Sequence, residues 1–105
     1  MPINKDAFFS MLGIAMRAGQ LSFGEDVVRK AIASGSAALV LLDAGASDNT
    51  RKRMCDSCAY YGVPLLETQA GRLGGAVGKP GRMSAAVVGG PLCDRLRQLA
   101  AQEGA

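Results

Sequence analysis

The side chains that most often carry out catalysis are scarce or scattered in this sequence. Histidine is absent, which removes the commonest general base and the commonest metal ligand. The one Cys-x-x-Cys pair, Cys55 and Cys58, has only Cys93 as a further thiol, so a zinc site would lack ligands. Carboxylates fall on separate predicted elements, at Asp26, Asp43, Asp48 and Glu67. The sequence therefore predicts a non-enzymatic protein without a metal or cofactor.

Thiol redox chemistry at the Cys-x-x-Cys pair is one alternative that the sequence leaves open. A redox pair usually lies at a helix N-terminus, where the helix dipole lowers a thiol pKa. Cys55 instead falls about two turns into its predicted helix, although Arg51 and Lys52 would favour a thiolate there. The other interpretation is that Cys58 is a small core residue and that Cys55 flanks it.

A glycine-rich stretch between Gly71 and Gly81 invites comparison with loops that bind phosphate. However, Pro80 follows Lys79 at the position where Ser or Thr would hold the metal of a nucleoside triphosphate. The stretch also does not follow a strand and open a helix, as dinucleotide-binding fingerprints do. We do not expect a nucleotide site there.

A polar partner could be bound between residues 21 and 35, where a short strand meets a helix through Gly24. The alternative is an ordinary amphipathic helix with favourably placed acids in its first turn. Glycine lets a backbone approach a partner closely, and the amides after it carry the positive end of the helix dipole. Apolar side chains recur at helical spacing and are predicted to face a core, namely Val27, Val28, Ala31 and Ile32. The polar side chains are predicted to be exposed, namely Asp26, Arg29 and Lys30.

Composition fits one folded domain over residues 1–105. The chain is 49% hydrophobic, has no Trp, and carries a net charge of +3 with 12 cationic side chains. Most of these are Arg, whose planar fork matches phosphate and guanine edges. No apolar run reaches membrane-spanning length and the start lacks a signal-peptide profile. We therefore expect a cytoplasmic protein.

Helical and strand patterns alternate along the chain. We predict a helix capped by Asn4 and continuing to Ala18, with later helices over 24–34, 48–61 and 70–77 and a last one from Pro91. Strands are predicted at 20–23, 37–42, 63–67 and 83–88, the second of them buried on both faces. Alternation of this kind predicts a three-layer α/β/α sandwich around a four-stranded, mostly parallel or mixed sheet.

Three side-chain roles follow from these elements. Ser47 is predicted to cap the helix over 48–61, and Met54, Cys58 and Tyr61 to form its inner stripe, with residues 51–53 on its outer side. Asp43, at the end of the buried strand, is predicted to hydrogen-bond a loop. Gly13 lies inside the first helix, where it suggests that another backbone packs close.

Several segments, taken in order, resemble one protein family. They are residues 12–21, Gly24-Glu25-Asp26, residues 30–32, 34–35, 48–50 and 60–64, and Leu73-Gly74 with 77–79. Together they are similar to the ribosomal L7Ae/L30e superfamily of kink-turn RNA-binding proteins, in its bacterial YlxQ-type branch. The resemblance covers about residues 5 to 100 and implies an α/β/α sandwich and non-catalytic RNA binding.

The resemblance also implies which residues contact RNA. RNA-binding members carry Gly-x-Asn-Glu-x-x-Lys at a strand-to-helix junction, where Gly24 and Lys30 match the glycine and the lysine. Asp26 and Val27 occupy the asparagine and glutamate positions, and Asp26 can accept but not donate a hydrogen bond. A second contact is a loop before the last strand, occupied here by Gly81 and Arg82. The RNA-binding residues that we expect are Gly24, Glu25, Asp26, Arg29, Lys30, Lys79, Gly81 and Arg82.

We therefore expect a monomeric protein that binds structured RNA, ribosomal or other, with no membrane partner. Ribosomal or RNA-processing proteins are possible further partners. The alternative is a protein–protein interaction module on the same fold, because the Asn-Glu pair of the family pattern is absent.

Overall fold

Within residues 2–103, which the computed structural model describes, helices and strands alternate in the predicted order. The helices are α1 (Asp6–Arg17), α2 (Glu25–Ser34), α3 (Asp48–Tyr61), α4 (Arg72–Val77) and α5 (Pro91–Glu103). The strands are β1 (Leu21–Phe23), β2 (Ala37–Asp43), β3 (Leu65–Thr68) and β4 (Ser84–Val88). Every predicted element is therefore present, with ends that move by a few residues.

The four strands form one mixed sheet in the order β1-β4-β2-β3. β2 pairs with β3 in parallel, whereas β4 is antiparallel to both β1 and β2. Of the two predicted alternatives the mixed sheet is correct, because the last strand returns between the first two instead of adding to an edge. Consequently β1, β2 and β3 all point in one direction and β4 alone points in the other.

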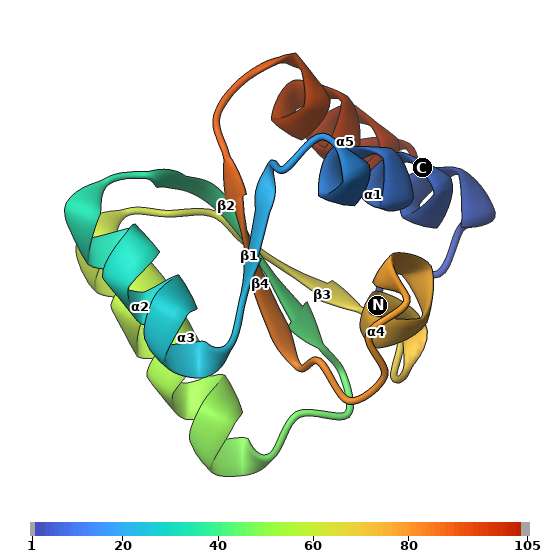
Figure 1. Ribbon diagram of the computed structural model, residues 1–105. Helices are drawn as coiled ribbons and strands as arrows, with labels where there is room; N and C mark the ends of the chain where they lie inside the picture. The colour runs from blue at the N-terminus through green and yellow to red at the C-terminus, as the bar shows by residue number, and fades with distance from the viewer. Residues whose placement is uncertain (1, 104–105) are drawn as a thin grey trace.

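Helices cover both faces of this sheet, α2 and α3 on one side and α1, α4 and α5 on the other (Figure 1). The division follows from the alternation of side chains along β2. Leu39 and Leu41 pack with α1, α4 and α5, whereas Val40 and Leu42 pack with α2 and α3. All four of these side chains are fully buried, which confirms the predicted three-layer α/β/α sandwich.

Two of the predicted helix details are wrong and one is confirmed. Asn4 does not cap α1: the residue before the helix is Lys5, which has no capping hydrogen bond, and Asn4 Oδ1 accepts from Arg72 Nη1 at 3.2 Å. Tyr61 is not on the inner stripe of α3, since its side chain is half exposed while Met54 and Cys58 are buried. Ser47 caps α3 as predicted, its Oγ accepting from the Thr50 N–H at 3.2 Å.

Glycines on α1 and α4 permit two close backbone contacts. A Cβ at Gly13 would lie 3.4 Å from the carbonyl oxygen of Ala76, so α4 packs close to α1 there, as the sequence predicts. A Cβ at Gly74 would lie only 2.7 Å from the carbonyl oxygen of Lys79 and 3.2 Å from the Gly81 nitrogen. The loop that leads to β4 therefore folds back against α4, and only a glycine at position 74 leaves room for it.

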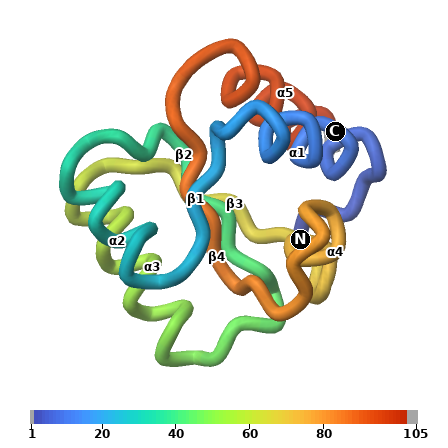
Figure 2. The backbone as a smooth tube through the Cα atoms, viewed as in Figure 1, coloured from blue at the N-terminus to red at the C-terminus, as the bar shows by residue number. Residues whose placement is uncertain are grey.

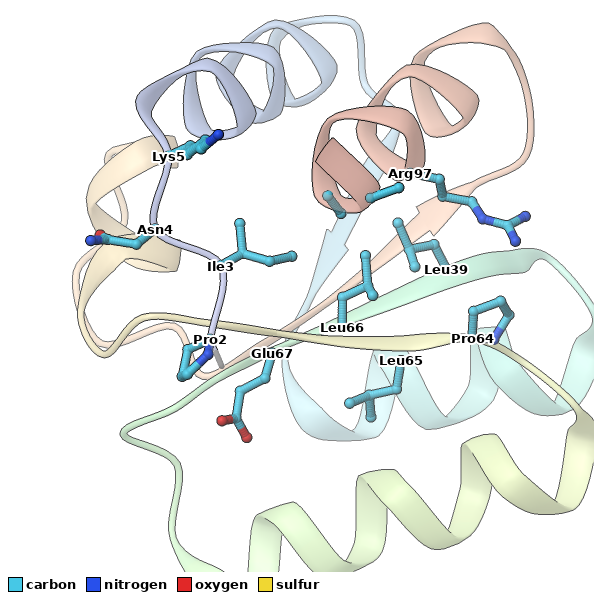
Figure 3. A pocket seen from close by; sticks show the side chains of 12 residues that line it. Pro2, Ile3, Asn4, Lys5, Leu39, Pro64, Leu65, Leu66, Glu67 and Arg97 are labelled. Carbon is cyan, nitrogen blue, oxygen red and sulfur yellow. The ribbon is translucent and has the colours of Figure 1, made fainter. Parts of the chain in front are cut away.

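A cavity opens between the N-terminal segment, β3 and the end of α5 (Figure 3). Leu65 and Leu66 point to opposite sides of β3, and Leu66 faces Leu39 inside the cavity. Glu67 turns toward the other side, where its carboxylate forms an ion pair with Arg51. The segment at Ile3 pairs with Thr68 as one parallel bridge at this edge. The cavity walls are thus mainly apolar, and the acid on its rim already has a partner.

The contact at Gly74 can be tested by substitution. Gly74→Ala should lower the free energy of unfolding by about 1–3 kcal/mol, because the added methyl group must displace the loop backbone. Gly75→Ala is the matched control: nothing lies within 4 Å of its Cβ position, so stability should be unchanged or raised by up to about 1 kcal/mol. Urea denaturation of both variants measures this, and equal effects would contradict the close contact.

Candidate nucleic-acid interface

Because β1, β2 and β3 run in one direction and β4 runs in the other, four segments lie at a single edge of the sheet. They are the loops after β1, β2 and β3 and the start of β4. Phe23 at the end of β1 lies opposite Ala85, and Leu42 near the end of β2 lies opposite Ser84. Figure 2 shows the chain leaving β1 for α2 and the chain entering β4 after α4 at this same edge. The strand–helix junction at Gly24 and the loop before β4 are therefore neighbours, although about sixty residues separate them in sequence.

The junction between β1 and α2 depends on Gly24. Its φ of 97° and ψ of 139° lie in a region that favours glycine. Its carbonyl oxygen accepts from the Val28 N–H at 2.9 Å, which closes the first turn of α2, and no side chain caps the helix. A Cβ at Gly24 would meet nothing within 4 Å. The start of α2 therefore presents main chain to open space, with the positive end of its dipole outward.

Four exposed side chains surround this junction. Asp26, Arg29 and Lys30 are exposed, as predicted. Val27 is 51% exposed, so its predicted place in the core is wrong. Only Val28 and Ile32 of α2 are buried against the sheet, and Val27 is rotated by about 100° from Val28 around the helix. The exposed surface of α2 consequently includes an apolar side chain beside its charges.

Glu25 differs from its neighbours because its carboxylate is engaged by side chains of α3. It accepts hydrogen bonds from Arg53 Nη2 at 3.0 Å and from Thr50 Oγ1 at 3.3 Å, and it also pairs with Arg53 Nε. The hydrogen bond from Arg53 is the main cause that lowers the pKa of Glu25, and the pKa of Arg53 is raised in turn. Glu25 thus ties the start of α2 to α3.

The loop before β4 contributes a cation beside the junction. The guanidinium carbon of Arg82 lies 5.9 Å from the centroid of the Phe23 ring, within the range of a cation–π contact. Arg82 and Gly81 are exposed. Lys79 lies at the α4 end of the loop, where its N–H donates to the Gly74 carbonyl oxygen at 2.9 Å. The structure therefore places Arg82 next to the junction and Lys79 farther along the same loop.

Asp43 stabilises this edge of the sheet through hydrogen bonds with the surrounding loops. Its fully buried carboxylate accepts from the Gly45 N–H at 2.7 Å and from the Gly71 N–H at 2.9 Å, so the predicted loop hydrogen bonding is confirmed. Its own N–H donates to the Met83 carbonyl oxygen at 2.8 Å. One residue thereby connects the loops after β2 and β3 to the segment that enters β4.

The cations of α3 are mostly engaged within the protein. Arg51 pairs with Glu67 and donates to the Ala44 carbonyl oxygen at 3.1 Å, and Arg53 pairs with Glu25. The exposed Lys52 lies 3.7 Å from Asp56. Lys52 and Arg53 are exposed, as expected of an outer row at residues 51–53, whereas Arg51 is partly buried. Arg51 and Arg53 both reach sideways to neighbouring elements.

The three cysteines are free thiols. Cys58 is buried, as the core interpretation predicts, and burial together with the nearby Cys55 raises the pKa of its thiol to about 11. Burial also raises the pKa of Cys93. A raised pKa disfavours the thiolate that redox chemistry requires. Among residues 2–103, no group of three or more His, Cys, Asp or Glu could hold a metal ion.

The length and apolarity of the described helices decide whether one of them could cross a membrane. None of those in the part of the chain that the structure describes is both long and apolar enough to cross a bilayer.

A sequence model of the ribosomal protein L7Ae/L30e/S12e/Gadd45 family matches residues 6–94, which is most of the chain. The chain belongs to this family. The match extends from the first residue of α1 into α5, so it includes the junction at Gly24 and the loop before β4.

Bacterial relatives within this family resemble the chain over most or part of its length. The "RNA-binding protein YlxQ" of Bacillus subtilis (strain 168) is 40% identical over 93 residues, which cover 88% of this chain and 93% of the relative. A protein of the same name from Enterococcus faecium is 38% identical over 64 residues, or 61% and 62% of the two chains. The chain is thus similar to the YlxQ branch, as its sequence segments indicate.

Solved structures of this family's fold superpose closely. A Bacillus halodurans protein described as of unknown function has a TM-score of 0.86 and 34% identity, with 92% of this chain and 99% of that chain covered. The "Giardia lamblia 15.5kD RNA binding protein" has a TM-score of 0.77 at 18% identity, with 99% and 93% covered. The second likeness concerns the fold alone.

Phe23 and Val27 were not among the residues expected at the site, and the structure places both at this edge. The sequence carries a signal for Val27, because it stands three residues before Lys30, on a neighbouring position of one helix face. Phe23 carries none, since its proximity to Arg82 depends on the pairing of β1 with β4. That pairing is a tertiary property.

The pairing of Glu25 with Arg53 predicts a pH effect on stability. Glu25 has a folded pKa below its usual 4.5, so its contribution is present at neutral pH and is lost as the pH falls through the lowered pKa. Wild type should therefore be more stable than Glu25→Gln at neutral pH, and the gap should close in acid. Denaturant titrations of both proteins from neutral pH to about 3 measure the gap. A constant gap would contradict the assignment.

Proposed function

We propose that this protein binds structured RNA without catalysis, at the junction of β1 and α2 and at the loop before β4. The observation that carries the proposal is the juxtaposition of an uncapped helix N-terminus at Gly24 with the exposed cation Arg82. Main-chain amides at a helix start and a guanidinium beside the preceding strand suit the phosphate groups of a nucleic acid. The names of the bacterial relatives support RNA as the partner.

Within the part of the chain that the structure describes, the exposed cations at this surface form no ion pair, and neither do Arg17, Arg95 and Arg97 elsewhere. The salt bridges within residues 2–103 involve the cations Arg51, Lys52, Arg53 and Arg72. In contrast, no ion pair within residues 2–103 involves Arg29, Lys30 or Arg82, all of which are exposed. Cations without an internal partner can neutralise phosphates without first breaking a contact. We assign these three side chains to the RNA backbone, with Lys79 and Gly81 lining the same loop.

Base recognition at this junction differs from that of the family pattern. Asp26 can accept a hydrogen bond from a guanine amino group, but it cannot donate as an asparagine would. Val27 presents an apolar side chain where the pattern has glutamate. We therefore propose that phosphate contacts supply most of the affinity and that preference for a kink-turn is altered. Glu25 acts by positioning the start of α2 through Arg53.

The cellular setting completes the proposal. We place the protein in the bacterial cytoplasm as a monomeric accessory factor for ribosomal or other structured RNA. Support comes from the family, which includes ribosomal proteins by name, and from the YlxQ relatives of two bacteria. No enzymatic role is proposed, because the described residues hold neither histidine nor a clustered set of metal-ligating side chains.

Two substitutions test the proposed contacts. Lys30→Ala and Arg82→Ala should each weaken binding of a hairpin RNA several-fold and reduce the salt slope of the binding constant by about 1, because each removes one phosphate contact. Arg95→Ala on the exposed side of α5 is the matched control and should change neither quantity. Fluorescence anisotropy over a range of salt concentrations measures both.

The probes should be a kink-turn hairpin, an unkinked hairpin of equal length and a random single strand. At least one of the two hairpins should bind better than the random strand at low salt. If no structured RNA does so, the proposed function is wrong.

A further inference from the structure

The outer surfaces of α2 and α3 form a groove that begins at the proposed RNA site. The two helices lie side by side over the same face of the sheet (Figure 1). The α2 wall is formed by residues at helical spacing, which are Asp26, Arg29, Lys30 and Ala33. The α3 wall is formed by Ser57 and Tyr61. Three of these side chains are proposed RNA contacts, so the groove leads from the junction toward the C-terminal end of α3.

Two exposed tyrosines end α3 beside this groove, and Tyr61 is the one that lines it. Tyr60 is 82% exposed and Tyr61 is 50% exposed. Their ring centroids are 4.8 Å apart at an interplanar angle of 72°, an edge-to-face arrangement. Phe8 and Phe9, by comparison, are buried. Because α3 packs through Met54 and Cys58, the core does not require these tyrosine rings.

The charges of the groove indicate which class of molecule could bind there. Arg29 and Lys30 have no ion pair within residues 2–103, and Asp26 is the one acid among the lining residues. The groove therefore has two neighbouring cations against one acid on its α2 wall and an aromatic ring on its α3 wall. Single-stranded nucleic acid offers both complements, since its phosphates match the cations and its bases stack on aromatic rings.

We propose that this groove binds an unpaired segment of RNA that continues from the structured RNA at the junction. The segment leaves the structured RNA at Arg29 and Lys30 and continues along the groove, where a base stacks on the exposed face of Tyr60 or Tyr61. Asp26 to Ala33 spans about 10 Å along α2, so the segment is short. The proposal rests on the proposed function, because the structured RNA delivers the segment to the groove.

The first experiment compares a blunt hairpin RNA with the same hairpin carrying a short uridine extension on its 5′ or 3′ strand. Wild type should bind at least one extended hairpin about 5- to 100-fold more tightly than the blunt one. The double variant Tyr60→Ala/Tyr61→Ala should lose this gain while binding the blunt hairpin unchanged. Tyr60→Phe/Tyr61→Phe should keep the gain, because it retains the rings. Equal binding of blunt and extended hairpins by wild type would overturn the proposal.

Tyrosine fluorescence supplies a second readout that is specific to the groove. The chain has no Trp and only two Tyr, at positions 60 and 61, so tyrosine emission reports on this surface alone. After correction for absorption by RNA, the extended hairpin should quench the emission and the blunt hairpin should not. Equal emission with both hairpins would also overturn the proposal.

Failure of the groove and failure of the proposed function give different results. A blunt hairpin that binds no better than a random strand contradicts RNA binding at the junction, whatever the tyrosine variants do. A blunt hairpin that binds well, with no gain from either extension, contradicts only the groove. That second result would be expected if Tyr60 and Tyr61 contact a protein.

Discussion

The antiparallel insertion of β4 between β1 and β2 is the constraint on which the arrangement of this molecule depends. Because β1, β2 and β3 run in one direction, their C-terminal ends meet at one edge, and the start of β4 joins them there. Adding β4 in parallel at an outer edge would move Arg82 away from Gly24. The candidate interface is therefore a consequence of the strand order, and it uses segments from both halves of the chain.

Internal contacts then hold this edge in place. Asp43 bonds the loops after β2 and β3, Gly74 admits the loop that carries Arg82, and Glu25 joins α2 to α3 through Arg53. These residues are engaged with the protein itself, whereas Asp26, Arg29 and Lys30 project away from it. The division between supporting and exposed side chains suits a surface that binds a large polar partner without rearranging.

Local sequence signals predicted much of the fold. The buried run of β2, the cap at Ser47 and the glycine at position 13 each specify structure through nearby residues or one dominant pattern. The strand order was not predictable in this way, because a buried apolar strand does not reveal its direction. For the same reason, the ion pairs of Arg51 with Glu67 and of Arg53 with Glu25 appear only once the elements have packed.

The candidate site was predicted in part through family resemblance and in part through helical periodicity. Gly24, Asp26 and Lys30 were predicted from their positions in a motif, and Arg29 from its place on the exposed face of α2. Periodicity misassigned Val27 and Tyr61, because α2 and α3 each bury a narrower stripe than the apolar pattern suggests. An apolar residue type at the boundary of a stripe does not determine which way it faces.

Ultraviolet crosslinking of the whole protein to total bacterial RNA, followed by mass spectrometry of the crosslinked peptides, tests the central claim most directly. The account predicts crosslinks at the sheet edge, in peptides that contain Phe23 to Lys30 and Arg82 to Met83. Crosslinks confined to α1 and α5 on the other face of the sheet, or no crosslinks above background, would contradict it.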